Sequence, residues 1–226
     1  MLKNSTDYAP TYVLIAANVA VYAVTSYLSG SAYQTSDAVL NQYGQINYLV
    51  LPPYYQVWRL FTAMFVHANI AHIAGNMLFL FIFGLRAEKM FDLKEYLAVY
   101  FLSGLGGGLL TLLLGDVLFG PGMVSVGASG AIFGVVAAVT IFPRRAIGQS
   151  MLSGLMSLFL LFVLNLSSNV NYLAHLGGLA VGLLLGYFFG AARRQYRQVT
   201  YEFKFPSSYI FGLSSQEINE KPRAAS

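Results

Sequence analysis

Apolar segments close to the length of a membrane span recur along the 226-residue chain, and they restrict its fold more than any other feature. A helix needs about 20 apolar residues to cross the hydrocarbon core of a bilayer. Hydrophobic residues make up 57% of the chain and charged residues only 10%, which leaves too little polar surface for a soluble globular protein. The sequence therefore predicts an all-α membrane protein, a bundle of six transmembrane helices.

The six spans are expected at residues 11–28, 61–85, 96–114, 126–143, 147–166 and 172–192. The fourth is short for a full crossing because Pro143 is expected to end it, so its first turn should lie inside the membrane. Residues 29–56 form a long first loop, and Trp58 with the nearby tyrosines is typical of the headgroup level. We expect this loop to be associated with the membrane, and we place Asp116 in a short loop after the third span.

The chain is thus divided into an N-terminal segment (1–10), a helical membrane domain (11–192) and a polar tail (193–226). The first apolar segment is either a cleaved signal peptide or a retained span, and we favour the retained span. The sequence contains no cysteine, which excludes disulfides, zinc-thiolate sites and a cysteine nucleophile.

Basic residues lie on one side of the predicted bundle. Six spans put both termini on the same side, where the basic residues are Lys3, Arg86, Lys89, Lys94, Arg144, Arg145, Arg193, Arg194 and Arg197. The opposite loops contain Arg59 alone. Lysine and arginine are enriched in cytoplasmic loops. We therefore expect a multi-pass protein of the cell membrane with both termini in the cytoplasm.

Ser129 lies between glycines at the start of the predicted fourth helix, in the segment Gly127-Ala128-Ser129-Gly130. Small neighbours leave its hydroxyl accessible to a substrate. Unpaired backbone N–H groups and the positive end of the helix dipole would surround an oxyanion formed there. Ser129 is therefore either a small residue in a helix contact or a nucleophile.

The chain has only three histidines, and all of them lie in apolar segments. At ~1.5 Å per helical residue, Ser129, His72 and His175 lie about 22, 21 and 27 Å from the basic residues that mark the cytoplasmic boundary. Polar side chains at such depth are costly unless they meet partners or water. Their common level indicates a buried polar site.

The helical spacing of small residues predicts how the fourth and sixth helices pack. On the sixth, His175 shares a face with Gly178 and Gly182, and Gly130 and Gly134 form a matching ridge on the fourth. On the second helix, His72 and Asn76 are four residues apart and share a face.

The chain resembles the rhomboid family of intramembrane serine proteases, in its bacterial and archaeal six-span type, from about residue 11 to 192. Its matching motifs are Gly-Ala-Ser-Gly-x-x-x-Gly (127–134), Ala-His-Leu-Gly-Gly-x-x-x-Gly (174–182), the His67, His72 and Asn76 set, and Trp58-Arg59. The resemblance implies that Ser129 is the nucleophile and His175 the general base of a dyad. It also implies that His72, Asn76 and the backbone N–H of Ser129 bind the oxyanion.

The same resemblance assigns supporting roles to Gly127, Gly130, Phe133, Gly178 and Gly182. Phe133 stands where relatives often have a tyrosine, so ring stacking on the catalytic histidine is expected without a hydroxyl contact. Glu88 matches an acidic residue that makes structural hydrogen bonds. Transmembrane protein substrates and the lipid bilayer are the expected partners, with no cofactor, metal or nucleic acid.

Other interpretations stay open for several residues. His67 either holds the first loop or takes part in catalysis, and His72 and Asn76 could instead link helices by hydrogen bonds. A catalytically inactive rhomboid-like factor, for binding or quality control, is the alternative function. A transporter is disfavoured because the spans contain almost no ionisable groups besides the histidines. No Glu lies between His67 and His72, which excludes a His-Glu-x-x-His zinc site. The physiological substrate and the oligomeric state are left open.

Overall fold

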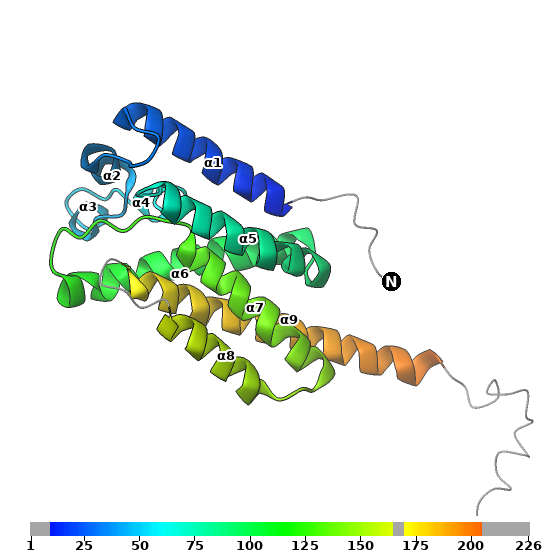
Figure 1. Cartoon of the computed structure of the whole chain (residues 1–226). Coiled ribbons are helices and arrows are strands. Elements are labelled where there is room, and N and C mark those ends of the chain that lie inside the picture. The colour runs from blue at the N-terminus through cyan, green and yellow to red at the C-terminus, as the bar shows by residue number, and fades with distance from the viewer. Residues whose placement is uncertain (1–9, 165–169, 205–226) are drawn as a thin grey trace, which may run out of the picture.

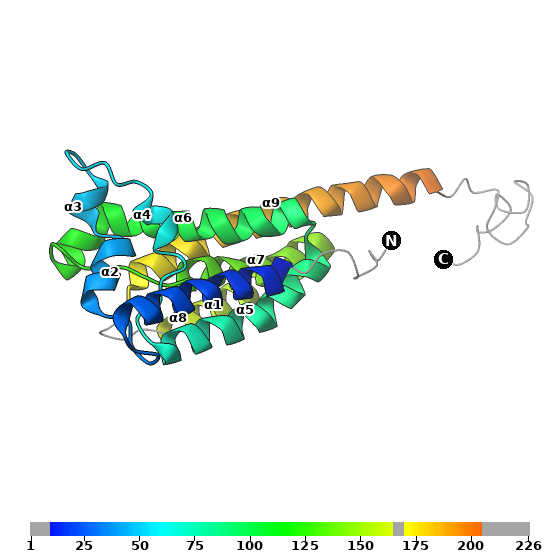
Figure 2. The same cartoon turned by 90° about the horizontal axis from the view of Figure 1, so that it is seen from above.

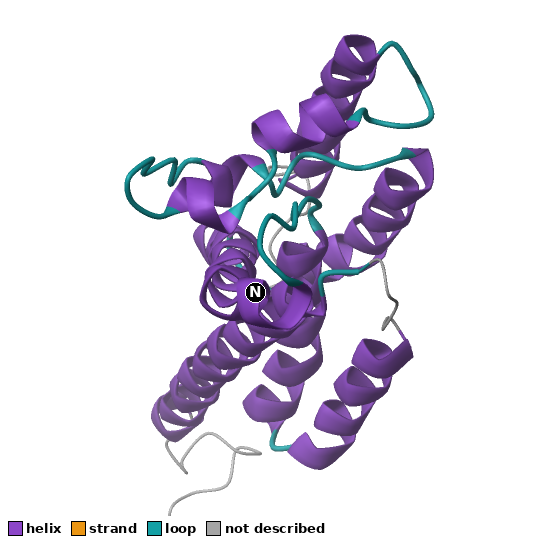
Figure 3. Ribbon diagram, turned by 90° about the vertical axis from the view of Figure 1, so that its left-hand side faces the viewer, coloured by secondary structure: helices purple, strands orange, loops and turns teal. Residues whose placement is uncertain are grey.

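The computed structural model describes residues 10–164 and 170–204, and within these ranges the chain consists of helices and connecting loops (Figures 1 and 3). Its helices are α1 (Pro10–Ser29), α2 (Asp37–Tyr43), α3 (Asn47–Val50), α4 (Arg59–Thr62), α5 (Ile70–Met90), α6 (Leu93–Phe119), α7 (Ser129–Ile147), α8 (Met151–Leu164) and α9 (Tyr172–Lys204).

Five of these helices are long and apolar enough to cross a membrane, namely α1, α5, α6, α7 and the Tyr172–Arg194 part of α9. The fifth predicted span corresponds to α8, whose apolar part, Met151–Val163, is shorter. The predicted all-α bundle of membrane helices is confirmed. The predicted N-terminal segment before residue 10 and the tail beyond residue 204 lie outside the described residues.

Helix α7 occupies the centre of the bundle. Every residue from 130 to 139 is buried, and the helix contacts α5, α6, α8 and α9 (Figure 1). A helix that is apolar on all sides is stable only when other helices surround it. Helix α1 lies outside this centre against α5, and the last part of α9 projects beyond the other helices (Figure 2).

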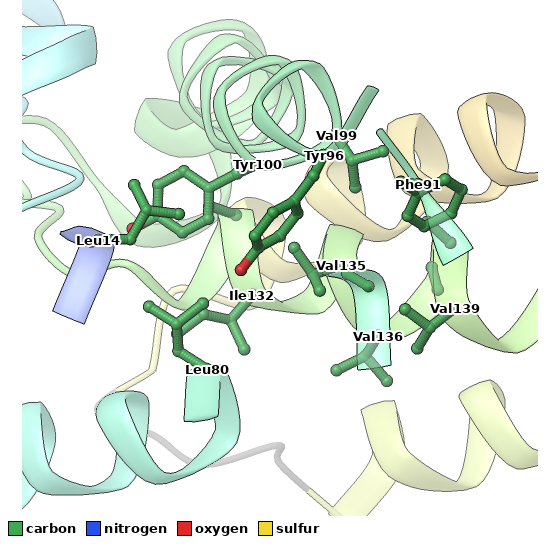
Figure 4. Packing of buried hydrophobic residues seen from close by; sticks show 14 of the residues in the cluster. Leu14, Leu80, Phe91, Tyr96, Val99, Tyr100, Ile132, Val135, Val136 and Val139 are labelled. Atoms are coloured by element: carbon green, nitrogen blue, oxygen red, sulfur yellow. The ribbon is translucent and has the colours of Figure 1, made fainter. Parts of the chain in front are cut away.

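The apolar core lies between α1, α5, α6 and α7. Figure 4 shows side chains from these helices and from the α5–α6 connection meeting in one cluster: Leu14, Leu80, Phe91, Tyr96, Val99, Tyr100, Ile132, Val135, Val136 and Val139. At the edge of this cluster, the Oε1 atom of Glu88 accepts a hydrogen bond of 2.8 Å from the backbone N–H of Thr11. Glu88 therefore links α1 to α5.

Glycines bring α7 and α9 into backbone contact. A Cβ atom at Gly182 would lie 2.5 Å from the Cα of Gly134, and one at Gly178 would lie 2.7 Å from the carbonyl carbon of Gly130. Real Cβ atoms do not approach so closely, so any side chain there would force the helices apart. The structure thus pairs the small-residue ridge of α7 with that of α9, and this pairing determines where His175 lies.

The first loop is folded onto α6 through polar contacts. The Arg59 side chain is only 5% exposed, and its Nη1 atom donates a 2.6 Å hydrogen bond to the carbonyl oxygen of Gly44. The Nε2 atom of Gln45 donates to the carbonyl oxygen of Gly108 on α6 at 2.9 Å. Trp58 stays 45% exposed, as expected for a residue at the membrane interface.

The predicted start of the second span is wrong. Helix α5 begins at Ile70, because the Oδ1 atom of Asn69 caps the helix by accepting a hydrogen bond of 2.8 Å from the backbone N–H of His72. The short helix α4 and turns precede it. His67 consequently lies before the helix rather than in its first turn.

Other predicted boundaries differ as well, including the start of the fifth span, which is predicted at residue 147 and lies at Met151 in α8. Pro143 lies inside α7, which continues to Ile147 and ends at Gly148 in the left-handed conformation (φ 74°). Proline is tolerated in a membrane helix where neighbouring groups satisfy the freed backbone.

Asp116 lies within α6 and not in a loop, because this helix extends to Phe119. The side chain of Asp116 accepts a hydrogen bond of 2.9 Å from the side chain of Asn47. Helix α9 runs past residue 192, and Arg193 there pairs with Glu95 at 2.9 Å.

Candidate active site

The first residue of α7 meets α9 in a serine–histidine contact. The Oγ atom of Ser129 lies 2.8 Å from the Nε2 atom of His175, a hydrogen-bond distance. His175 is only 6% exposed and is held beside α7 by the glycine contacts described above. A hydroxyl donating to a neutral imidazole nitrogen is the geometry of an activated nucleophile.

Phe133 holds the plane of the His175 ring. The two ring centroids are 4.2 Å apart and the planes differ by 12°, which is a stacked arrangement. Phe133 follows Ser129 by one helical turn, so the two side chains share a face of α7. In the described part of the chain, no Asp or Glu hydrogen-bonds to His175. The arrangement is therefore a dyad without a carboxylate.

His72 and Asn76 of α5 converge on the turn that precedes Ser129. A Cβ atom at Gly127 would lie 2.8 Å from the Nε2 atom of His72 and 3.6 Å from the Nδ2 atom of Asn76. Gly127 has a φ of 120°, a conformation that side chains disfavour. Its N–H group donates to the carbonyl oxygen of Ala63 at 2.8 Å, which fixes the turn.

The donors around this turn are available to a ligand. Asn76 is 8% exposed, and its Nδ2 atom is buried with no hydrogen-bond partner among the described residues. Such an unpaired buried donor costs free energy unless something accepts from it. Ser129 begins α7, so its N–H group has no carbonyl partner from a preceding helical turn.

A cavity of about 740 Å³ connects these groups. It is lined by the four polar residues Ser129, His175, His72 and Asn76, and otherwise mostly by apolar side chains of several helices, such as Phe79, Ile132 and Leu161. Its volume is within the range of ligand-binding pockets. Among the side chains that the structure describes, no cluster of three His, Cys, Asp or Glu suited to a metal ion is present.

Sequence reasoning missed Asn171. Its Nδ2 atom donates to the Oγ atom of Ser125 at 2.7 Å and to Oγ1 of Thr111 at 2.9 Å, and its Oδ1 atom accepts from the backbone N–H of Ala174 at 3.2 Å. It joins α6, the loop before Ser129 and the start of α9. Asparagine directly before a predicted helix is a preferred N-cap, and this signal indicates the capping role.

Comparison with known proteins defines the family. The Rhomboid domain matches residues 54–192, more than half of the chain. This chain belongs to the rhomboid family. It is 30% identical over 206 residues to "RHOMBOID-like protein 1" of Arabidopsis thaliana, covering 78% of this chain and 52% of that relative. The match to "RHOMBOID-like protein 6, mitochondrial" of the same organism is 34% over 158 residues, covering 67% of this chain and 50% of the relative.

A bacterial relative has a name that mentions proteolysis. "Putative rhomboid protease YdcA" of Bacillus subtilis is 35% identical over 135 residues, covering 58% of this chain and 66% of its own. This rhomboid spans about half the length of the two Arabidopsis relatives named above. The resemblance inferred from the motifs is confirmed, and so is the class of multi-pass membrane protein.

Proposed function

We propose that this rhomboid is an intramembrane serine endopeptidase that cleaves peptide bonds in or near the transmembrane segments of single-span membrane proteins. The observation that supports this most strongly is the 2.8 Å contact between the Oγ atom of Ser129 and the Nε2 atom of His175, inside a cavity with free hydrogen-bond donors. Family membership and the protease names of some relatives also support it.

In the proposed reaction, His175 removes the proton of Ser129 as its oxygen attacks the carbonyl carbon of the scissile bond. The oxyanion forms beside the N–H group of Ser129 and the side chains of His72 and Asn76. His175 then gives the proton to the leaving amine, and an acyl-enzyme remains on Ser129. A water molecule, deprotonated by His175, hydrolyses this ester and releases the new carboxyl terminus.

The proposed position of the site restricts the substrate. We place both termini of the rhomboid in the cytoplasm and the 29–56 loop outside, which puts the dyad about 20 Å above the cytoplasmic boundary. Only a bond near the outer end of a substrate helix reaches this level. That stretch must be extended, because a helix keeps its carbonyls in internal hydrogen bonds. Small or helix-breaking residues near that end therefore favour cleavage.

We assign this activity to the helical domain 11–192, between a cytoplasmic N-terminal segment (1–10) and a cytoplasmic tail (193–226). Reporter fusions at residue 226 and within the 29–56 loop test the orientation. A C-terminal reporter found outside the cell would contradict it.

The activity is tested with the purified rhomboid and a single-span substrate, comparing the wild type with Ser129→Ala. We expect cleavage by the wild type and none by the variant, with equal thermal unfolding in detergent. A fluorophosphonate probe should label Ser129 in the wild type, and labelling should fall strongly in His175→Ala. Cleavage by folded Ser129→Ala protein, or loss of wild-type cleavage on metal chelation, would refute a serine mechanism.

A further inference from the structure

His67 has no part in the proposed reaction, although it lies next to a residue that does. Its side chain is 0% exposed, and its ring centroid lies 5.1 Å from that of His72, with the ring planes at 69°. A polar ring so deeply buried must be hydrogen-bonded or be costly to the fold. The hydrogen bonds of His67 therefore bear on its role.

One of the two nitrogens of His67 carries the proton, and the structure indicates which. Its Nδ1 atom lies 3.1 Å from the carbonyl oxygen of Phe65, and a carbonyl oxygen only accepts, so Nδ1 is the donor. Burial, with a smaller contribution from the neighbouring His72, lowers the pKa of His67 to about 3, so its ring is neutral near pH 7. A neutral imidazole has one N–H group, which leaves Nε2 as a bare acceptor. This Nε2 is buried and has no partner among the described residues.

The ring of His72 also has one nitrogen that carries no proton when His72 acts in the proposed mechanism. The Nε2 edge of His72 faces Gly127, where the oxyanion is proposed to form, and a Cβ atom there would lie 2.8 Å from it. To donate to an oxyanion, a neutral His72 must carry its proton on Nε2, and its Nδ1 is then a second bare acceptor. Two acceptors cannot hydrogen-bond to each other, but one water molecule has two protons to donate. Two hydrogen bonds of about 2.9 Å that meet at one water hold their two acceptor atoms roughly 4.7 Å apart. The rings of His67 and His72 are close neighbours, with centroids 5.1 Å apart.

We propose that His67 is a positioning residue for His72, and that it acts through one water molecule that donates to Nε2 of His67 and to Nδ1 of His72. The water keeps the His72 proton on Nε2, where it points at the oxyanion. Without the acceptor on His67, the water loses its orientation and the Nδ1–H form of His72 becomes accessible. That form would present a lone pair to the negative charge. The inference rests on the proposed protease function, since it gives His67 a role in oxyanion binding.

The kinetic test uses two substitutions of His67 in two backgrounds. His67→Gln keeps an acceptor oxygen near the position of Nε2, whereas His67→Leu has a similar size and no acceptor. In the wild-type background we expect His67→Leu to lower kcat by roughly 10-fold with KM nearly unchanged, a smaller loss than the one of about 10²- to 10³-fold expected when an oxyanion donor is removed outright. His67→Gln should recover most of that loss. In a His72→Ala background, neither substitution should lower kcat further, because there is no ring left to position. Equal losses in both backgrounds, or a change confined to KM, would overturn the proposal.

A second measurement does not depend on activity. The chain has only three histidines, so the ring nitrogens of ¹⁵N-histidine-labelled protein can be assigned by removing each histidine in turn. The wild type should show His72 protonated on Nε2 and His67 protonated on Nδ1, and His67→Leu should give a mixture of His72 tautomers. A wild-type His72 protonated on Nδ1 would overturn the proposal, even if His67→Leu failed to fold. Failure of the protease function itself is recognised separately, by wild-type protein that cleaves no substrate or by cleavage that survives in Ser129→Ala.

Discussion

Gly127→Ala is the substitution whose effect can be worked out most directly from the structure. The new Cβ would lie 2.8 Å from the Nε2 atom of His72, whereas ordinary contacts begin at 3.4 Å, so the ring must retreat by about 0.6 Å (3.4 − 2.8). A hydrogen bond of about 2.9 Å stretched by that amount reaches about 3.5 Å, the limit of a useful interaction. Loss of one oxyanion donor costs about 10²- to 10³-fold in kcat. We expect Gly127→Ala to lose activity by that factor.

The matched control for this substitution is Gly122→Ala. Both glycines have a positive φ, 120° for Gly127 and 84° for Gly122, but a Cβ at Gly122 meets nothing within 4 Å. Each alanine therefore carries a backbone strain of about 1–3 kcal/mol, and only the one at position 127 displaces His72. Both variants should unfold at lower temperature than the wild type in detergent, while kcat falls strongly only in Gly127→Ala. Folded Gly127→Ala protein with a kcat within a few-fold of the wild type would refute the reasoning, and so would an equal loss in Gly122→Ala.

Three further substitutions have expected outcomes. Phe133→Ala removes the ring that stacks on His175, an interaction worth about 0.5–1.5 kcal/mol. The kcat in the cleavage assay should therefore fall by up to about 10-fold, and an unchanged kcat would contradict the positioning of His175 by stacking. Asn171→Ala removes the cap of α9 and two side-chain hydrogen bonds, so the free energy of unfolding should fall by about 1–3 kcal/mol, measured by denaturant titration in detergent micelles. Gly182→Leu forces α7 and α9 apart, so little folded protein should be recovered by size-exclusion chromatography, and a normal yield would contradict the close packing.

Much of this protein was predictable because the relevant information is local in the chain. A run of apolar residues predicts a membrane helix wherever it occurs, and α1, α6 and the core of α9 follow from that alone. The four-residue spacing of Gly178 and Gly182 also defines one face of a helix before its partner is known. The prediction that Ser129 lies at the start of a helix also used only nearby residues, and α7 begins at Ser129 in the structure.

Boundaries and supporting contacts could not be obtained in the same way. Residues 61–66 are mostly apolar and lie directly before the second span in the sequence, but the structure places them in α4 and the turn after it, and α5 begins only after the cap at Asn69. Helix α7 continues through Pro143 to Ile147, although a proline in the sequence usually predicts the end of a helix. Membrane helices tolerate proline where neighbouring groups satisfy the freed backbone, and such neighbours are not contained in the local sequence.

The sequence by itself determined the class of protein, the membrane helices and the chemical groups of the site, because hydropathy, helical periodicity and side-chain chemistry are properties of the chain alone. The tertiary structure alone decided which of these groups meet. The contact between Ser129 and His175 joins residues 46 apart, and Asn171 reaches Thr111 across 60 residues. Their hydrogen bonds depend on distances of a few tenths of an ångström. The distance between Ser129 and His175 depends on how closely the glycine faces of α7 and α9 allow the two backbones to approach.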